Sequence, residues 1–438
     1  MIGAGAAGLA AAHDLSLAGL QTTVIEARNR IGGRIFTVRD TNSALPIELG
    51  AEFVHGEPEP LLKVIQTAKL VLNLLPDNHH LLNKGRFSPV PRFWRTLGEL
   101  SQGIGRSIRR KKNDTSFLEY LEQNHLPKKQ RELLLNFVEG FQAADPAKIS
   151  SRSLAEGAEE LLSGYKQFHV ASGYDGVANW LRTNTNPDLV DFRLNTIVTN
   201  LAWKRGDVNA QCVTASRTSL EVFHARVAII TIPNALLKSK FVRITPELTE
   251  KQSAAKKLGS GQIFKMVLQF QNSFWEEDKL ISTRLKKNSP TEDLNFIHAQ
   301  GEDVPVWWTP SPSRAPTLTA WAGGPKAEKL LAEKDQTRVD RTLSSLARTF
   351  GLPRKAVDEL LIGSASHDWR ADPFSRSAYS YVSVGGMSAA KELAKPVQKT
   401  LFFAGEATDL DEMGTVAGAV ASGQRAAREC IRIVFRRR

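Results

Sequence analysis

The sequence predicts an α/β protein in which a βαβ unit opens the chain and its sheet is completed after long insertions. Three observations favour this class: a glycine-rich turn followed by an alanine-rich helix, the apolar strand 22–27, and strands of buried type that return after residue 190. We expect a discontinuous first domain, a helical part and a mixed α+β part, with boundaries at 1–80, 186–240 and 385–438 for the first domain, 81–185 for the helical part and 241–384 for the mixed part.

Residue periodicity also predicts the helices and strands that follow this first unit. Helical periodicity dominates from about 85 to 170, and segments rich in β-branched residues read as strands from 192 to 233. Within them, residues 225–232 resemble a buried parallel strand that returns to the first domain. Further on, strands are expected at 262–270 and 317–324 and helices at 327–334 and 339–350. From residue 401 onward we expect a strand, a loop and a long final helix rich in small residues.

Composition narrows the class of protein. A chain of 438 residues with 42% hydrophobic residues can build two or three domains. No stretch stays apolar for the ~20 residues of a membrane helix, and the first ten residues lack a charged n-region, so we expect a cytoplasmic protein with no membrane contact. Cys212 and Cys430 lie far apart, and the neighbours His79 and His80 fall in a segment that we interpret as a loop. No metal site is expected.

The net charge of +12 suits an acidic partner such as nucleic acid. The basic residues are mostly dispersed, however, and the one compact run, Arg106 with residues 109–112, is interpreted as a solvated helix face. We therefore expect no nucleic-acid partner.

The opening turn carries the first chemical signal. Gly3, Gly5 and Gly8 form G-x-G-x-x-G, which allows a tight turn, close backbone approach to a pyrophosphate and close packing of the next helix. Glu26 ends the following strand eighteen residues after Gly8, where a carboxylate accepts hydrogen bonds from a ribose diol. The combination predicts dinucleotide binding, whereas the motif alone would also fit a helix that is merely rich in glycine and alanine.

The next segment adds a second signal. Residues 26–34 read Glu-Ala-Arg-Asn-Arg-Ile-Gly-Gly-Arg, in which two glycines let the backbone turn beside phosphates and Arg34 can neutralise them. Here the sequence resembles, over nearly its whole length, the FAD-binding family that includes monoamine, polyamine and L-amino acid oxidases and the lysine-specific histone demethylases. The segments that carry the likeness further are 48–56, 173–176, 403–408 and 414–419.

This resemblance implies a Rossmann-like FAD-binding domain, discontinuous in sequence, with a mixed α+β substrate domain and a helical insertion. It implies FAD as cofactor, held non-covalently because residues 405–418 lack the cysteine that carries flavin in monoamine oxidases. In the family, the position of Val198 contacts adenine and that of Glu406 contacts the ribityl chain. The implied cofactor-binding residues are Gly3, Gly5, Ala6, Ala7, Gly8, Glu26, Ala27, Arg28, Gly33, Arg34, Gly50, Ala51, Glu52, Val198, Trp369, Gly405, Glu406, Gly414, Thr415 and Val416.

Four residues are implied as catalytic or substrate-contacting. Lys265 alternates with apolar residues on a strand, a pattern that alone leaves an outward, solvated side chain, but it matches the family lysine that holds a water at flavin N5. Tyr379 and Thr415 match the two walls of the substrate cage, although Tyr379 also fits a packed strand. His55 matches a histidine of the substrate channel in animal polyamine and spermine oxidases, with a loop hydrogen bond as the alternative.

Two departures concern the ends of the chain. The opening strand of the family is reduced to Met1-Ile2, which we expect to remove the pairing of a central parallel strand and to weaken FAD affinity. The last residues, 434–438, contain no membrane helix, so anchoring of the monoamine oxidase kind is not expected.

The resemblance implies oxidation of the C–N bond of a polyamine or other alkyl amine by hydride transfer to flavin N5, giving an imine and then aldehyde plus amine, while O2 becomes H2O2. Asp409, Asp411 and Glu412 are candidates for a cation-attracting entrance or a solvated acidic loop. The expected partners are the amine and O2, in a monomer or homodimer.

Three alternatives remain open at this point. One is an L-amino acid oxidase, with Arg370 or Arg376 paired to the carboxylate, or another FAD oxidase or desaturase on the same scaffold. Another is a demethylase-like or chromatin-binding, anion-binding protein. The last is a protein that binds FAD without turnover.

Overall fold

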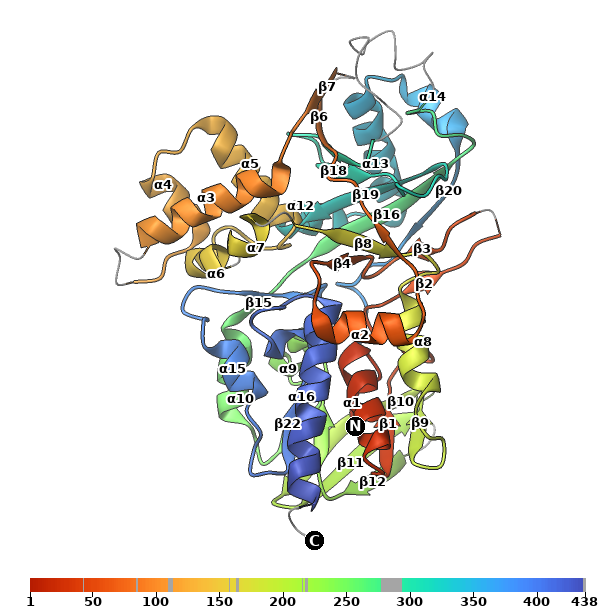
Figure 1. Cartoon of the computed structure of the whole chain (residues 1–438), viewed down its shortest axis with the longest axis vertical. Coiled ribbons are helices and arrows are strands. Elements are labelled where there is room, and N and C mark those ends of the chain that lie inside the picture. Colours follow the sequence, from red (N-terminus) through yellow and green to blue (C-terminus); the bar gives the residue numbers. More distant parts are fainter. Residues whose placement is uncertain are drawn as a thin grey trace.

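The computed structural model describes residues 1–41, 43–83, 86–108, 113–156, 158–162, 165–214, 216, 220–276 and 294–435. Figure 1 shows three parts: a lower part that contains both termini, an upper lobe of helices, and an upper sheet with helices packed against it. Residues 109–112 of the basic run lie outside the described residues, and Arg106 is exposed near the end of its helix. Within the described ranges, none of the helices combines the length and hydropathy of a membrane span.

The lower part is built on parallel strands, as predicted. β1 (Thr22–Ile25) pairs with β9 (Val190–Arg193), and β13 (Ala228–Ile230) pairs with β22 (Leu401–Phe403). Ile2 forms parallel bridges to both Ile25 and Ile230 and so joins the two pairs into one layer. The expectation that the short opening would remove this pairing is therefore wrong at Ile2.

Helices and a second sheet enclose this layer. The buried small residues of α1 (Ala6–Leu17) and α16 (Val416–Phe435) let these two helices pack side by side, as Figure 1 shows. The second sheet has the order β12-β11-β10-β14. The remaining elements of this part are α8 (Asp175–Thr183), β10 (Thr196–Lys204), β11 (Asp207–Thr214), β12 (Leu220–Ala225), α9 (Asn234–Lys238), β14 (Arg243–Thr245), α10 (Thr249–Lys256), α15 (Ala389–Ala394) and the 3₁₀ turn η2 (Glu406–Thr408).

The upper sheet has seven strands in the order β20-β16-β19-β18-β17-β6-β7. Its alternate residues, among them Phe264, Met266 and Leu268, form a buried core with the helices behind it. The elements are β6 (His79–Asn83), β7 (Arg86–Pro89), β16 (Ile263–Phe270), β17 (Phe296–His298), β18 (Val306–Trp308), β19 (Thr317–Gly323), α12 (Gly324–Leu331), α13 (Asp335–Phe350), α14 (Arg354–Leu360) and β20 (Leu361–Ser366).

The helical lobe agrees with the predicted helical part only in its middle. Residues 79–83, which we interpreted as a loop, form strand β6, because they pair in parallel with β17 more than two hundred residues later. Residues 167–170 form β8, which pairs with β4 and β5. The lobe itself contains α3 (Phe93–Ile108), α4 (Phe117–Gln123), α5 (Lys128–Gly140), α6 (Ser151–Glu156) and α7 (Ala158–Leu162).

Short elements lie between the parts. They connect the sheets and carry much of the site described below. They are β2 (Thr37–Val38), β3 (Ile47–Glu48), β4 (Phe53–His55), α2 (Glu59–Thr67), β5 (Leu72–Leu74), β8 (Gln167–Val170), β15 (Leu258–Ser260) and β21 (Ser380–Val382).

Candidate active site

One large cavity connects the three parts of the molecule. Its volume is about 1030 Å³, at the upper end of the range for small-molecule and cofactor sites. All the residues implied as cofactor-binding or catalytic line it except Gly8, which packs beneath it. The structure thus gathers residues from 3 to 416 around one space, although it does not by itself assign their roles.

The first end of the cavity lies at the glycine-rich turn. Gly3 has a positive φ of 101°, and a Cβ on Gly8 would lie 2.0 Å from the carbonyl oxygen of Gly3, so helix α1 can approach the turn only with glycine at this position. Glu26 accepts hydrogen bonds from the backbone N–H of Ala4 (2.8 Å) and of Arg28 (2.9 Å). These contacts hold the carboxylate at the cavity wall, where its remaining lone pairs suit a ribose diol.

Arg28 and Val198 flank this end. The Arg28 guanidinium donates to Asp372 (2.8 Å) and Ser375 (2.9 Å), so a buried ion pair already compensates its charge. The register of β10 shifts directly after Val198, at a bulge that disrupts the strand ladder beside the cavity.

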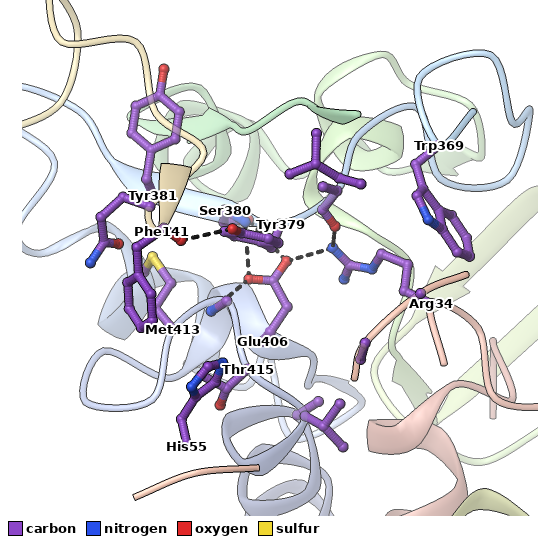
Figure 2. A pocket seen from close by; sticks show the side chains of 18 of the residues that line it. Arg34, His55, Phe141, Trp369, Tyr379, Ser380, Tyr381, Glu406, Met413 and Thr415 are labelled. Carbon is purple, nitrogen blue, oxygen red and sulfur yellow. Dashed lines mark hydrogen bonds and ion pairs between the residues drawn. The ribbon is translucent and has the colours of Figure 1, made fainter. Parts of the chain in front are cut away.

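The middle of the cavity is closed by a buried carboxylate, shown in Figure 2. Glu406 accepts from Arg34 (3.1 Å), from the backbone and hydroxyl of Ser380 (3.2 and 3.0 Å) and from the backbone of Gly414 (3.2 Å). Arg34 also donates to the carbonyl of Ala378. The early and late segments that the sequence singled out therefore meet in one network.

Lys265 lies at the other end, on β16, and its side chain is 2% exposed. The interpretation of Lys265 as an outward, solvated side chain is therefore wrong. Its Nζ lies 2.6 Å from Glu52 Oε2 and donates to the carbonyl of Gly50 (3.2 Å). Glu52 Oε1 accepts from the Trp308 indole (3.0 Å) and lies 3.3 Å from His169 Nε2. Burial alone would raise the pKa of Glu52, but Lys265 and His169 hold it at about 2.

The predicted substrate-contacting side chains already have partners. Tyr379 donates its hydroxyl to the carbonyl of Phe141 (2.7 Å), as Figure 2 shows, and burial raises its pKa. Thr415 accepts from the backbone of Gly418 and donates to that of Glu412, both at 2.9 Å, which caps helix α16. Because both hydroxyls are already hydrogen-bonded, the two side chains present mainly carbon atoms to the cavity.

His55 lies beside Phe141 and Tyr165, 5.2 and 5.8 Å from their ring centres. Burial lowers its pKa to about 4, so the imidazole is neutral near pH 7. The Gln167 amide nitrogen, 3.1 Å away, donates to Nδ1, which leaves Nε2 with the proton.

The substrate end contains many side chains that sequence reasoning missed. Aromatic side chains line it, and no local pattern could have indicated them because they come from separate elements. They are Trp94, Phe141, Tyr165, Phe296, Trp308 and Trp321. Apart from the residues already described, the charged side chains that line the cavity are Lys129, Glu132, Glu156, Asp411 and Glu412. Burial and the nearby Asp411 raise the pKa of Glu156.

Several other predicted residues lie elsewhere. Asp409 accepts a backbone hydrogen bond from Glu412 and does not line the cavity. Arg370 and Arg376 are not among the described residues that line the cavity. Arg370 donates to the carbonyl of Leu331, and Arg376 donates to the hydroxyl of Ser239. Among all the residues that the structure describes, no group of three or more His, Cys, Asp or Glu side chains is placed to hold a metal ion.

The family model for flavin-containing amine oxidoreductases matches residues 6–431. The chain belongs to this family. Its glycine-rich turn, the oriented Glu26 and the network at Glu406 fit FAD, and at Gly405 a Cβ would meet no atom within 4 Å, so the backbone there borders open space. The protein is thus an FAD-dependent amine oxidoreductase.

The sequence identity to individual relatives is below 30% in the examples that follow. The chain is 28% identical to probable polyamine oxidase 4 of Arabidopsis thaliana, over 100% of this chain and 87% of that protein, and 29% identical to polyamine oxidase 3 of Oryza sativa subsp. japonica, over 98% and 88%. It is also 27% identical to lysine-specific histone demethylase 1 homolog 3 of Arabidopsis thaliana, over 99% of this chain but only 30% of that protein.

Two solved structures show the same fold. Cyclohexylamine oxidase from Brevibacterium oxydans IH-35A matches with a TM-score of 0.80 at 20% identity, covering 99% of this chain and 98% of the other. Putrescine oxidase bound to putrescine matches with a TM-score of 0.79 at 20% identity, covering 98% of both chains. These likenesses agree with the predicted class, a Rossmann-like cofactor domain with a mixed α+β substrate domain.

Proposed function

We propose that this amine oxidoreductase oxidises a polyamine or another alkyl amine at a C–N bond and uses O2 as the electron acceptor. The observation that carries the proposal is the excess of acidic side chains in the lining of the cavity. Besides the charged residues already paired or hydrogen-bonded as described above, the cavity is lined by four carboxylates and one lysine, Lys129, although the whole chain carries +12. A local acidic surface attracts cationic amines even when the net charge opposes them.

The proposed reaction removes two electrons and two protons from the amine and transfers them to O2. The α-carbon of the amine gives up a hydride and its nitrogen a proton, so that a C=N bond forms. Water adds to this imine and releases an aldehyde and the second amine, while two electrons and two protons convert O2 to H2O2. FAD, when bound, supplies the two-electron acceptor between the amine and oxygen.

The residues of the chain supply orientation and a controlled environment. The aromatic walls exclude water and penalise charge, which favours loss of the ammonium proton before oxidation. Lys265, held by Glu52 and Gly50, presents a fixed N–H donor suited to a water molecule. Tyr379 contributes its ring, because its hydroxyl is bonded to Phe141. His55 offers an Nε2–H donor to a substrate.

The names of the relatives support the same chemical class, since several are polyamine oxidases. The alternative of an L-amino acid oxidase loses its two candidate arginines, which have other partners. No specific observation on the described residues favours a role on chromatin, and the chain spans less than a third of the demethylase homologue named above.

Anaerobic mixing tests the proposal. The purified yellow holoprotein is mixed with spermine, spermidine, putrescine, a monoamine, an L-amino acid and a methyl-lysine peptide, and flavin absorbance is followed. We expect bleaching by the polyamines or alkyl amines. If these leave the flavin oxidised, the proposal is wrong, and bleaching by the amino acid or the peptide alone assigns the alternative. Flavin that bleaches with dithionite but with no organic amine indicates binding of FAD without turnover.

A further inference from the structure

A row of side chains crosses the upper sheet from the Lys265 ion pair to a buried histidine pair. In register, Lys265 faces Trp321, Trp321 faces Val306, Val306 faces His298, and His298 faces Leu81. All five residues line the cavity. Because neighbours in register share one face of a sheet, the row forms a continuous wall across strands β16, β19, β18, β17 and β6.

The far end of this wall is the histidine pair. His79 Nδ1 and His298 Nε2 lie 2.9 Å apart. Phe93 stacks on both rings, with centroids 3.9 Å from His79 and 4.8 Å from His298, and Phe296 stacks on His79 at 4.7 Å. Burial lowers the pKa of both histidines, so the pair is neutral, and one ring must donate to the other.

Asp77 selects the direction of that hydrogen bond. Its Oδ1 lies 3.3 Å from His79 Nε2, where a bare nitrogen lone pair would be repelled by the carboxylate. The favoured tautomer of His79 therefore has its proton on Nε2 and accepts at Nδ1 from His298 Nε2–H. His298 Nδ1 is then a bare acceptor.

That acceptor belongs to the cavity. The side chain of His298 is partly accessible although the protein encloses it, and the accessible space that it lines is the cavity. Its only hydrogen-bond partner among the described residues is His79. The structure therefore offers an oriented acceptor, backed by a carboxylate and flanked by aromatic rings, at the end of the wall that begins at Lys265.

We propose that His298, oriented by His79 and Asp77, is a distal subsite that binds the far ammonium group of a long linear polyamine. The ammonium N–H donates to Nδ1, and the stacked rings and Asp77 stabilise its charge. This inference rests on the proposed function and narrows its substrate class.

The length of the wall sets the preferred substrate. Three strand spacings separate Lys265 from His298, and at about 4.8 Å each they total about 14 Å. An extended chain advances about 3.5 Å for every three bonds, so this span corresponds to about twelve bonds. A linear tetraamine reaches this far, whereas a short diamine does not.

Replacement of His298 tests the subsite. The His298→Phe holoenzyme keeps a stacking ring and loses the acceptor, and steady-state rates are measured with spermine, spermidine, putrescine and butylamine. We expect KM for spermine to rise about 10- to 100-fold, the effect of one hydrogen bond to a charged group, with kcat nearly constant and the short amines unaffected. His298→Asn, whose amide oxygen can occupy the Nδ1 position, is expected to recover much of the loss.

His80→Phe is the matched control. His80 neighbours His79 on β6 but pairs with Ile297, which lies in the core on the opposite face of the sheet, so spermine KM should stay unchanged. The subsite is refuted if His298→Phe affects all amines equally or none, or if His80→Phe has the same effect. Retained flavin absorbance and circular dichroism verify that each variant is folded.

Calorimetric titration with spermine separates the two proposals. If the unaltered holoenzyme oxidises no amine, the proposed function fails, yet tight spermine binding that His298→Phe weakens would still support the subsite. Oxidation of amines without any preference for chain length would overturn the subsite and leave the proposed function intact.

Discussion

Replacing Lys265 by methionine is expected to destabilise the protein as well as slow its flavin chemistry. The substitution leaves Glu52 buried beside the cavity without its cation, and the two charged atoms are only 2.6 Å apart in side chains that are 2% and 13% exposed. At an effective dielectric constant of about 20, their gross attraction is about 6 kcal/mol. Breaking a buried pair from one side typically costs about 3–5 kcal/mol, and we expect a loss of this size.

A double-mutant cycle isolates the pair. Urea unfolding of the holoprotein, followed by tryptophan fluorescence, gives the free energy of unfolding of Lys265→Met, Glu52→Gln and the double variant. We expect a coupling energy of about 2 kcal/mol or more, because glutamine removes the stranded charge. As a matched control, Lys251→Met removes another buried lysine, whose ammonium donates to main-chain carbonyls, and it should combine additively with Glu52→Gln. A Lys265→Met protein as stable as the original would refute the reasoning.

The pH dependence gives a second check on the same pair. The folded pKa of Glu52, about 2, lies below its unfolded value, so the pair contributes stability above about pH 4.5 and loses it as pH falls toward 2. In Lys265→Met the unpaired, buried Glu52 should have a raised pKa and protonate readily. The difference in unfolding free energy between the two proteins should therefore begin to narrow at the raised pKa of Glu52 in the variant, and narrow further as the original protein loses the pair between about pH 4.5 and 2. A difference that widened on acidification would contradict the assignment.

Three further outcomes follow from the site. Gly8→Ala should yield protein without flavin absorbance, since its Cβ would collide with Gly3, whereas Gly103→Ala, in open space on a helix, should stay yellow. His55→Asn should raise KM but leave the pH profile of kcat/KM unchanged above about pH 5, because the pKa of His55 is about 4; a lost ionisation near neutrality would be incompatible with this. Thr415→Ala should lower the free energy of unfolding by about 1 kcal/mol through loss of the helix cap, and Thr415→Ser should not; equal losses in urea titrations would exclude a capping role.

Much of the cofactor end could be predicted from sequence because its signals are local. The turn at Gly3 and Gly8, the carboxylate at Glu26 and the small-residue helix after Gly414 each lie within short segments whose spacing reflects backbone geometry. The strands predicted at 262–270 and 317–324 and the helices predicted at 327–334 and 339–350 overlap β16, β19, α12 and α13, whereas the shorter elements between them were not predicted. Such local features need no knowledge of which distant segments meet.

The substrate end could not be predicted in the same way. Glu52 and Lys265 were each assigned to the site, but their ion pair depends on packing between β16 and a loop that is more than two hundred residues away in sequence. His79 was interpreted as part of a loop, since the partner that makes its segment a strand is β17. The one local indication was the spacing of two residues between His79 and Leu81 and between Phe296 and His298, which places each pair on one face of its strand.

The network at Glu406 has a consequence for how the protein matures. Arg34 and Glu406 are separated by 372 positions, so the middle of the cavity cannot close until residue 406 has left the ribosome. A nascent chain carries the turn at Gly3 early, yet it lacks the carboxylate that ties Arg34 to Ser380. Stable binding of FAD should therefore follow the synthesis of residue 406 and should not occur on the first domain segment alone.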